Sequence, residues 1–578
     1  MNLKERILLA VATGRSLAGE TLEGVDLTGA DLRGIHLGGA TLVRVTLDQA
    51  RLDGGFLRGA SFMECSLVGA SFDRCDLGAV RLGGAMLAGA TLKRAKIVGS
   101  VLTAADLTGA DLGGAEVTNT DLVDADLTSA KFDGATLRGV RFDRATLVAA
   151  SFLEASIVEA SLGQTDLQRA RFDRATLTTV ALQKANLQDA SFEGASLERV
   201  VLVGADLRGA LLPRVMRETL LDEAKLGLLP AEGDLSGTSL DGQALSGVDL
   251  SGATLRLVSL RGANLRGANF EGAVLDSAVL VDADLKEARF SGVTFKSTVL
   301  SRANLEGVDL SDRDFEGVLL DGAKLKGANL SGARLERCVL RDAELEGADL
   351  SRALLRQVDL SGAKIQGTRT EKTIFDNVDF SGVRVSDLRL MGLTMTRCTF
   401  IDADLTSAKA RACNFSSSNF ERAKFDGAEL EQCNVSGANF RGAALDRLAA
   451  PKLAAKGAFF GGARLRKANL DGAQLRHAGF TAADLSHASL VGADLRESVL
   501  QGANLTGARL ASARLAHADL SHANATLADL SGADLERANL HDVRLDQSKI
   551  DAAARARARA TDPDQLAAER WKPPTRPA

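Results

Sequence analysis

The chain has 578 residues, with 70 Lys and Arg against 75 Asp and Glu, which gives a formal net charge of −5. Aromatic residues make up only 4% and Tyr is absent, so the surface offers little for base stacking and we expect no direct nucleic-acid binding. No stretch is long enough to span a membrane, and the apolar run at 7–12 is too short for the core of a signal peptide. We therefore expect no membrane association and a cytoplasmic location, while export without an N-terminal signal stays open.

Residues 1–14 have the pattern of a short helix, with Leu3, Ile7, Leu8 and Val11 on one side. The ends of a repeat array need capping, so we predict a helix that covers the first repeat. A helix that lies on a membrane surface is the alternative interpretation.

Residues 15–212 follow a period of five, because an apolar residue, mostly Leu or Phe, recurs at every fifth position from Leu17 to Leu212. This period fits neither the 3.6 of a helix nor the 2.0 of a strand, but it describes a square coil of four short sides and twenty residues. The residue two positions earlier is small, as in Ala110-Asp111-Leu112. We predict that large and small residues face inward, and that the next two residues turn the corner with positive φ at the second, often Gly.

Phenylalanine recurs at twenty-residue intervals inside this frame. Stacked coils would place such residues in one column, where the rings bury well and fix the register against slippage. We predict an internal core ladder of Phe132, Phe152, Phe172 and Phe192.

Residues 213–234 break the frame, because Leu212 and Leu235 are 23 residues apart. The stretch between Pro213 and Pro230 is compatible with a helix, so we predict a connecting excursion that is partly helical. Degraded repeats are the alternative, since Ala224-Lys225-Leu226 fits the pattern.

Residues 235–550 follow a second uninterrupted frame. Its clearest feature predicts another core ladder, formed by Phe380, Phe400, Phe420, Phe440, Phe460 and Phe480. At 446–457 the large and small residues exchange places, with Leu448 before Ala450 and Leu453 before Ala455, which roughly conserves core volume. We therefore expect the coil to continue there. The two frames hold about ten and sixteen coils, counted at twenty residues each.

Residues 551–578 leave the pattern. Residues 554–560 alternate Ala and Arg and should be helical, and Asp562-Pro563-Asp564-Gln565 has the form of a helix start with Gln reaching back to the cap. We predict a C-terminal helical cap in which Leu566 and Trp571 close the last coil, followed by a disordered tail.

The motif Ala-(Asp/Asn)-Leu-x-x resembles that of the pentapeptide-repeat proteins, most clearly from Gly262 to Phe270. This resemblance implies a right-handed quadrilateral β-helix, an all-β solenoid, here with short helical caps. In that family the quinolone-resistance members resemble duplex DNA in shape and charge and bind DNA gyrase. Other members accompany bacterial secretion systems or are secreted effectors, and the fold alone does not choose among these functions.

One acidic belt is a candidate partner surface. No Lys or Arg lies between Lys96 and Lys131, and the segment carries Asp106, Asp111, Glu116, Asp121, Asp124 and Asp126. Consecutive members fall on different sides of the coil, so they form a belt rather than a stripe. A solvated acidic band is the alternative interpretation.

The remaining reactive residues suggest no cofactor. All six cysteines occupy the small inward position, so we expect free, buried thiols at Cys65, Cys75, Cys338, Cys398, Cys413 and Cys433. His477, Glu497 and His517 share one outward column, but histidines two coils apart are about 9.6 Å from each other, too far to share a metal ion easily. We expect no metal site.

We find no catalytic constellation and expect no enzyme and no small-molecule substrate, because the outward residues lie on a convex surface. The sequence favours a non-enzymatic scaffold for protein partners, accessory to a bacterial secretion system in one version. The alternative is a DNA-mimicking regulator of DNA gyrase or another topoisomerase.

Overall fold

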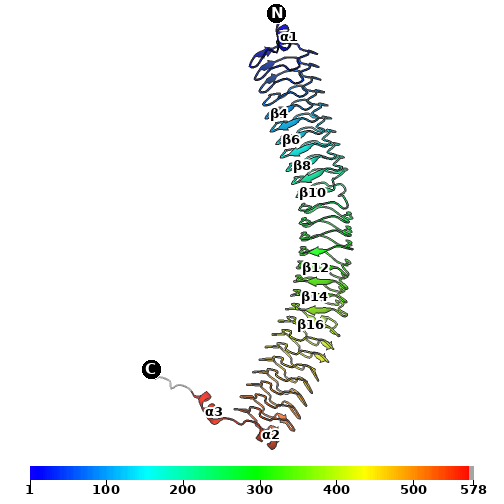
Figure 1. Ribbon diagram of the computed structural model, residues 1–578. Helices are drawn as coiled ribbons and strands as arrows, with labels where there is room; N and C mark the ends of the chain where they lie inside the picture. Colours follow the sequence, from blue (N-terminus) through cyan, green and yellow to red (C-terminus); the bar gives the residue numbers. More distant parts are fainter. Residues whose placement is uncertain (572–578) are drawn as a thin grey trace. The chain divides into compact units, whose positions relative to one another are not determined.

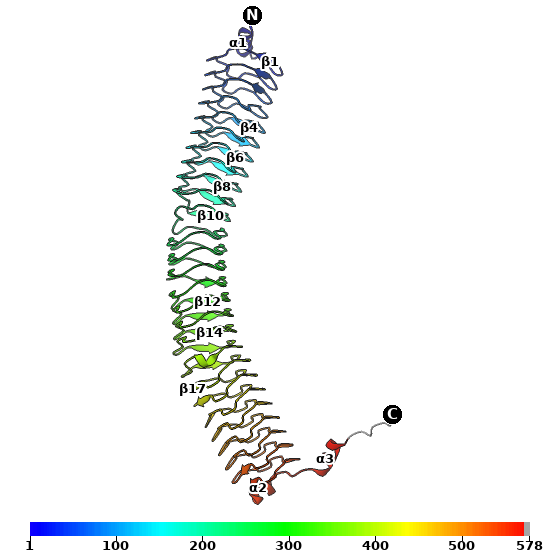
Figure 2. The ribbon, with the colours of Figure 1, turned by 180° about the vertical axis from the view of Figure 1, so that it is seen from behind.

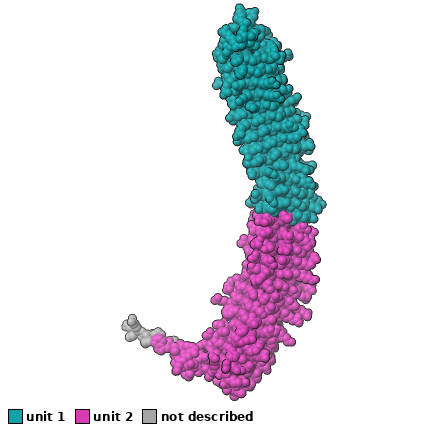
Figure 3. Space-filling model, viewed as in Figure 1, with its two compact units in different colours: residues 1–284, 288–293 teal, residues 285–287, 294–578 magenta. Residues whose placement is uncertain are grey.

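The computed structural model describes residues 1–571 of the chain. All strand pairings among them are parallel, and they form a β-solenoid of about 26 turns, so the expected all-β solenoid is confirmed. The chain divides into two compact units (Figure 3). Unit 1 consists of residues 1–284 and 288–293, and unit 2 consists of residues 285–287 and 294–578.

The hydrogen bonds of one pentad explain why the repeat has its sequence. In the pentad 107–111, the backbone N–H groups of the first, third and fifth residues donate to carbonyl oxygens of the adjacent coils. The fourth N–H, of Ala110, donates to the carbonyl oxygen of Leu107 at 2.9 Å and closes the corner. The second, of Thr108, donates to a side chain instead, Oδ1 of Asp106 at 3.0 Å. An Asp or Asn immediately before the central Leu therefore accepts a hydrogen bond from the one N–H that has no backbone acceptor.

In a second arrangement, the equivalent N–H donates to an Asp side chain of the preceding coil. Oδ1 of Asp143, a first corner residue, accepts from the N–H of Gly163 at 3.1 Å and from Oγ of Ser161 at 2.5 Å. The second corner residue has positive φ, as predicted, whether it is a Gly such as Gly109 at 67° or another residue such as Arg144 at 60°.

Unit 1 begins with α1 (Leu3–Thr13) and contains two sheets whose members pair in sequence order. Figure 1 and Figure 2 show β4 to β10 following one another along this unit. The first sheet comprises β1 (Thr21–Glu23), β2 (Thr41–Val43) and β3 (Ser61–Met63). The second comprises β4 (Lys96–Val98), β5 (Glu116–Thr118), β6 (Thr136–Arg138), β7 (Ser156–Val158), β8 (Thr176–Thr178), β9 (Ser196–Glu198) and β10 (Val215–Arg217).

Unit 2 contains three sheets, a short 3-10 helix η1 (Val385–Asp387) and two terminal helices. The first sheet comprises β11 (Phe295–Lys296), β12 (Asp314–Glu316), β13 (Arg334–Glu336), β14 (Leu354–Arg356), β15 (Ile374–Asp376) and β16 (Thr394–Thr396). The others comprise β17 (Lys409–Arg411) with β18 (Glu429–Glu431), and β19 (Asp529–Leu530) with β20 (Lys549–Ile550), followed by α2 (Ala552–Arg557) and α3 (Pro563–Arg570).

The core of each unit consists of stacked columns of inward side chains. The rings of Phe132, Phe152, Phe172 and Phe192 are buried and stack with centroids 4.8 to 4.9 Å apart. The six phenylalanines from Phe380 to Phe480 stack in the same way, and Phe420 lies 4.9 Å from Phe440. At the exchanged positions Leu448, Ala450, Leu453 and Ala455 are all buried, so a large residue can occupy either inward position.

Residues 213–234 do not contain the expected helix. Strand β10 lies there and pairs with β9, with Val215 opposite Ser196, nineteen residues away instead of twenty. Asp234 lies opposite Val215, again nineteen residues away. Two coils are therefore one residue short, and Leu229 supplies buried apolar volume in the second. The solenoid hydrogen bonds outweigh the helix-compatible pattern because the strand positions pair on both sides. The two-segment domain division itself stays a prediction.

Helix α1 lies at the expected N-terminal position. Asn2 and Glu5 form a capping box, with the N–H of Glu5 donating to Oδ1 of Asn2 at 2.8 Å. Ile7 and Ala10 are buried, and Arg6 pairs with Glu20 of the first coil at 2.7 Å. No helix among residues 1–571 has the length and apolar character needed to cross a bilayer.

The C-terminal end differs from the prediction in three ways. Helix α2 ends at Arg557, and Arg559 is extended and pairs beside Asn539, because the last coil needs a strand there. Asp562 caps α3, but the side chain of Gln565 donates to Glu569 at 2.8 Å instead of reaching back to the cap. Trp571 is 68% exposed and closes nothing. The expected disordered tail, 572–578, lies outside the described residues.

Candidate functional site

The acidic belt is partly neutralised by cations from neighbouring coils. Nζ of Lys93 lies 3.1 Å from Asp111, and Arg141 lies 3.1 Å from Asp121. Arg144 forms two hydrogen bonds of 2.8 Å with Asp124, and this hydrogen bonding lowers the pKa of that carboxyl group. The sequence alone does not pair these cations with the belt, because each lies eighteen or twenty residues from its acidic partner.

The other three belt residues stand on two opposite sides of the coil. Asp106 and Asp126 occupy adjacent positions of one column, as expected, and each accepts the backbone N–H of the residue two positions later. Glu116 is exposed at the start of β5, beside Lys96 and Thr136. The structure therefore places only Asp106 and Asp126 of the belt in one column, and it spreads the rest around the coil.

The histidine column at 477, 497 and 517 forms no three-residue group. His477 lies 3.5 Å from Glu497, but Arg476 also pairs with Glu497, and this hydrogen bonding lowers the pKa of Glu497. The carboxylate thus already has a cationic partner. Among residues 1–571, the groups of His, Cys, Asp and Glu close enough to share an ion do not include this column.

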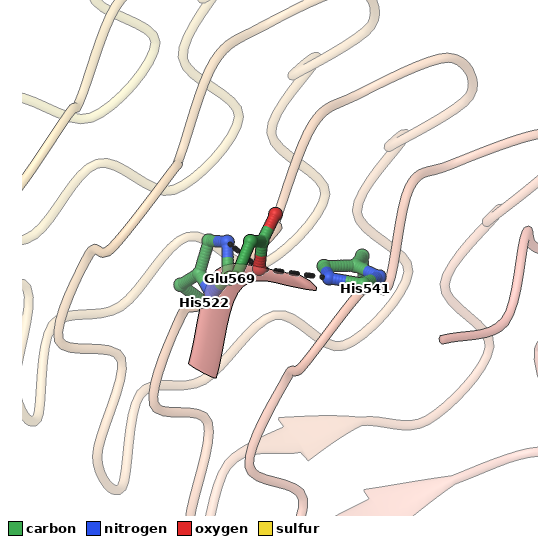
Figure 4. A group of neighbouring side chains, drawn as sticks. All are labelled: His522, His541 and Glu569. Carbon is green, nitrogen blue, oxygen red and sulfur yellow. Dashed lines mark hydrogen bonds and ion pairs between the residues drawn. The ribbon is translucent and has the colours of Figure 1, made fainter. Parts of the chain in front are cut away.

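A different cluster lies at the C-terminal end of unit 2, and sequence reasoning missed it. Figure 4 shows Glu569, from α3, between His522 and His541, from two successive coils. Oε2 of Glu569 lies 3.2 Å from Nε2 of His541 and 3.5 Å from Nε2 of His522. One ligand atom from each residue lies within 4.8 Å of the other two. His541 is only 3% exposed.

Further groups fix the orientation of this cluster. Nδ1 of His522 lies 3.3 Å from Asp542, and Asp542 pairs with Arg570 of α3 at 2.8 Å. The hydrogen bond from His522 lowers the pKa of Asp542. The backbone N–H of Asp562 donates to Nδ1 of His541 at 3.2 Å. The twenty-residue spacing of His522 and Asp542 was visible in the sequence, but Glu569 lies outside the repeat and no periodic argument could place it.

One surface hollow of unit 2 is lined mainly by apolar and charged side chains. It has a volume of about 460 Å³ and is lined by Leu388, Arg389, Met391, Lys409, Arg411 and Glu431, among others. Its charges pair with one another, with Lys409 lying 3.6 Å from Glu429 and Arg411 lying 3.5 Å from Glu431.

The six cysteines are buried and none forms a disulfide. The thiol of Cys75 donates to the carbonyl oxygen of Leu52 at 3.0 Å, and burial raises its pKa to about 12. Burial likewise raises the pKa of Cys398 to about 12. Thiols with so little thiolate character are poor nucleophiles and poor metal ligands.

Comparison with known proteins identifies the repeat. The family model for pentapeptide repeats matches most of the chain, over residues 22–155, 177–212, 234–390, 403–442 and 455–550 in overlapping copies. No curated protein matches the chain.

Two similar solved structures are repeat proteins that are shorter than this chain. QnrB1, a plasmid-mediated fluoroquinolone resistance protein, is 18% identical over 42% of this chain and 91% of its own, with a TM-score of 0.23. HetL, involved in heterocyst differentiation regulation in the cyanobacterium Nostoc sp. strain PCC 7120, is 24% identical over 52% and 96%, with a TM-score of 0.13. These TM-scores support no argument about function.

Proposed function

The chain belongs to the pentapeptide-repeat family, and on this premise we propose that it is a non-enzymatic scaffold that binds protein partners through the outer surface of its coils. The observation that supports this most is a band of exposed apolar side chains in unit 1. Its members, which we call the apolar band, are Phe56, Met63, Val68, Met86 and Val101. Between residues 102 and 210, no large apolar side chain is comparably exposed.

The apolar band departs from the usual composition of the outward positions. Phe56 and Met86 stand immediately before a central Leu, where Asp, Asn, Ser and Thr are common, and they are 52% and 49% exposed. Met63, at a corner, is 53% exposed. Apolar side chains on a soluble surface carry a solvation cost that protein binding would remove. They stand on more than one side of the solenoid, and their concentration in a few successive coils favours a binding role.

The charged surface supports a protein partner more than a nucleic acid or a mimic of one. Opposite charges face each other on adjacent coils, as in Lys364 with Glu344 at 2.9 Å and Arg422 with Asp402 at 2.8 Å. Such pairing neutralises these charges locally, whereas steering of a polyelectrolyte needs an extended region of one sign.

The apolar band can be tested by affinity capture from the source cells, followed by mass spectrometry. The full chain should capture specific proteins, and a variant with Phe56→Ser, Met63→Ser and Met86→Ser should lose them while its circular dichroism is unchanged. The matched control is Leu211→Ser with Leu257→Ser, which removes apolar side chains that are 61% and 68% exposed elsewhere in unit 1.

Equal capture by the wild type and the apolar-band variant would contradict the proposed surface. Capture that the control loses equally would indicate nonspecific adsorption to apolar side chains and would contradict it as well.

A DNA-mimicking regulator of gyrase has less support, because three of the six belt carboxylates are paired with cations. We expect excess purified protein to leave gyrase supercoiling unchanged. Inhibition or protection that a Glu116→Gln, Asp106→Asn and Asp126→Asn variant loses would instead favour the mimic. An accessory role in a bacterial secretion system and a cytoplasmic location stay predictions.

A further inference from the structure

We propose that His522, His541 and Glu569 bind one first-row transition-metal dication, with Zn²⁺ as the representative ion, and that this ion fastens α3 to the last coils of unit 2. Two imidazoles and one carboxylate are a common ligand set for zinc, with a further position open to water. Two nitrogen ligands disfavour Mg²⁺ and Ca²⁺, which prefer oxygen.

The distances fit a shared ion with little movement. Ligand atoms about 2.1 Å from a tetrahedral ion are roughly 3.4 Å from one another. The two distances from Oε2 of Glu569, 3.2 Å to His541 and 3.5 Å to His522, are close to this value. The ligand atoms of the two histidines lie within 4.8 Å of each other, so they need only a small movement to share one ion.

The hydrogen bonds of His522 favour a positive species, either a proton or a metal ion, between its ring and Glu569. Its Nδ1–H can donate to Asp542 at 3.3 Å, which leaves the lone pair of Nε2 directed toward Oε2 of Glu569. Two lone pairs that face each other repel unless a proton on Nε2 or a metal ion lies between them. A carboxylate behind a histidine is also the usual support of a metal-ligating imidazole, because it fixes the ring orientation and raises its basicity.

One contact opposes metal binding and must change when the ion enters. The N–H of Asp562 donates to Nδ1 of His541, which places that ring's hydrogen on Nε2, toward Glu569. Coordination through Nε2 moves this hydrogen to Nδ1 and displaces the Asp562 amide. That contact is a single hydrogen bond of 3.2 Å, weaker than a metal–nitrogen bond. Because Asp562 caps α3, the ion should alter the start of the helix.

The consequence is a metal-dependent attachment of α3. The helix buries no residue of its own, so polar contacts from Glu569 and Arg570 hold it to the coils. An ion shared by one helix residue and two coil residues would replace weak contacts with coordinate bonds.

Untagged full-length protein, stripped with a chelator, should bind one Zn²⁺ per chain in a competition titration with a chromophoric chelator. Co²⁺ should give the visible absorption of a tetrahedral site. Glu569→Gln and His522→Gln, at side chains that are 36% and 35% exposed, should each weaken Zn²⁺ binding by more than about tenfold. His477→Gln, at another partly exposed histidine, is the control and should bind like the wild type.

Hydrogen exchange supplies the second measurement. Zn²⁺ should slow exchange in peptides from 558–571 of the wild type and of His477→Gln, but not of Glu569→Gln. Absence of Zn²⁺ binding, equal binding by all variants, or loss in His477→Gln would overturn the site. Binding with unchanged exchange at 558–571 would overturn the attachment of α3.

Discussion

At the scale of the residue, the repeat is organised by one backbone N–H that has no backbone acceptor. Thr108 and Gly163 show the two ways of pairing it, with an Asp of the same pentad or with an Asp of the preceding coil. A half-buried N–H without a partner costs free energy, so an acceptor at one of these positions is favoured. This requirement, together with apolar burial, explains the frequent Asp and Asn beside the central Leu.

Replacing Asp143 with Ala should show how much free energy is lost when the N–H of Gly163 has no acceptor. Gly163 loses its acceptor, and we expect about 1 kcal/mol of local destabilisation, or roughly fivefold faster exchange in peptides that contain Gly163. Hydrogen exchange with mass spectrometry measures this. Asp124→Ala is the control, because Asp124 pairs with Arg144 and accepts from no backbone N–H. If both variants exchange alike, the backbone role of Asp143 is refuted.

At the scale of the element, the coil tolerates different placements of its large residue. Leu448 and Ala450 are 1% and 0% exposed, although each occupies the position that the other residue type usually takes. Total volume therefore matters more than the identity of one position, as in other cores with conserved volume.

Exchanging these two residues tests that interpretation. Leu448→Ala alone leaves a cavity and should destabilise by about 2–4 kcal/mol, while Ala450→Leu alone overfills the core and should cost about 1–3 kcal/mol. The double variant restores the common pattern, so it should lie within about 1 kcal/mol of the wild type. Denaturant unfolding measures all three. The pair Leu448→Ala with Leu535→Ala, several coils apart, should be additive. Additivity in the first pair as well would contradict shared volume.

The sequence predicted elements well where they repeat and poorly where they do not. Phe420 could be placed beside Phe440 because a fixed interval maps onto a column. Val215 could not be placed, because a coil of nineteen residues hides its partner at 196 from a search at twenty. Glu569 meets His522 and His541 through a helix outside the repeat, so its neighbours depend on chain path rather than on period.

At the scale of the whole molecule, many carboxylates are stabilised in the charged form in both units. Hydrogen bonds with arginines lower the pKa of Asp446 and Asp494, and Arg33 lowers that of Asp31 to about 2. A lowered folded pKa means that the unfolded chain binds more protons in acid, so these groups stabilise the fold above their unfolded pKa near 3.9.

Stability should therefore be nearly constant from about pH 8 to pH 5 and should fall as pH decreases from about 4 toward 2. Urea unfolding at a series of pH values, at constant ionic strength, measures this. Asp446→Asn with Asp494→Asn should show a smaller decrease between pH 5 and pH 3 than the wild type. A midpoint that stays constant or rises on acidification would contradict the assignment.

The two coils that are one residue short indicate where the repeat tolerates insertions and deletions during evolution. Asp234 pairs with Val215, nineteen residues before it, and with Thr254, twenty residues after it. The strands therefore stay aligned although residues are missing between them. Both omissions fall between strand positions, at 212–214 and at 226–233. Insertions and deletions in related genes should therefore accumulate between strand positions, and homologues should be aligned with their gaps there.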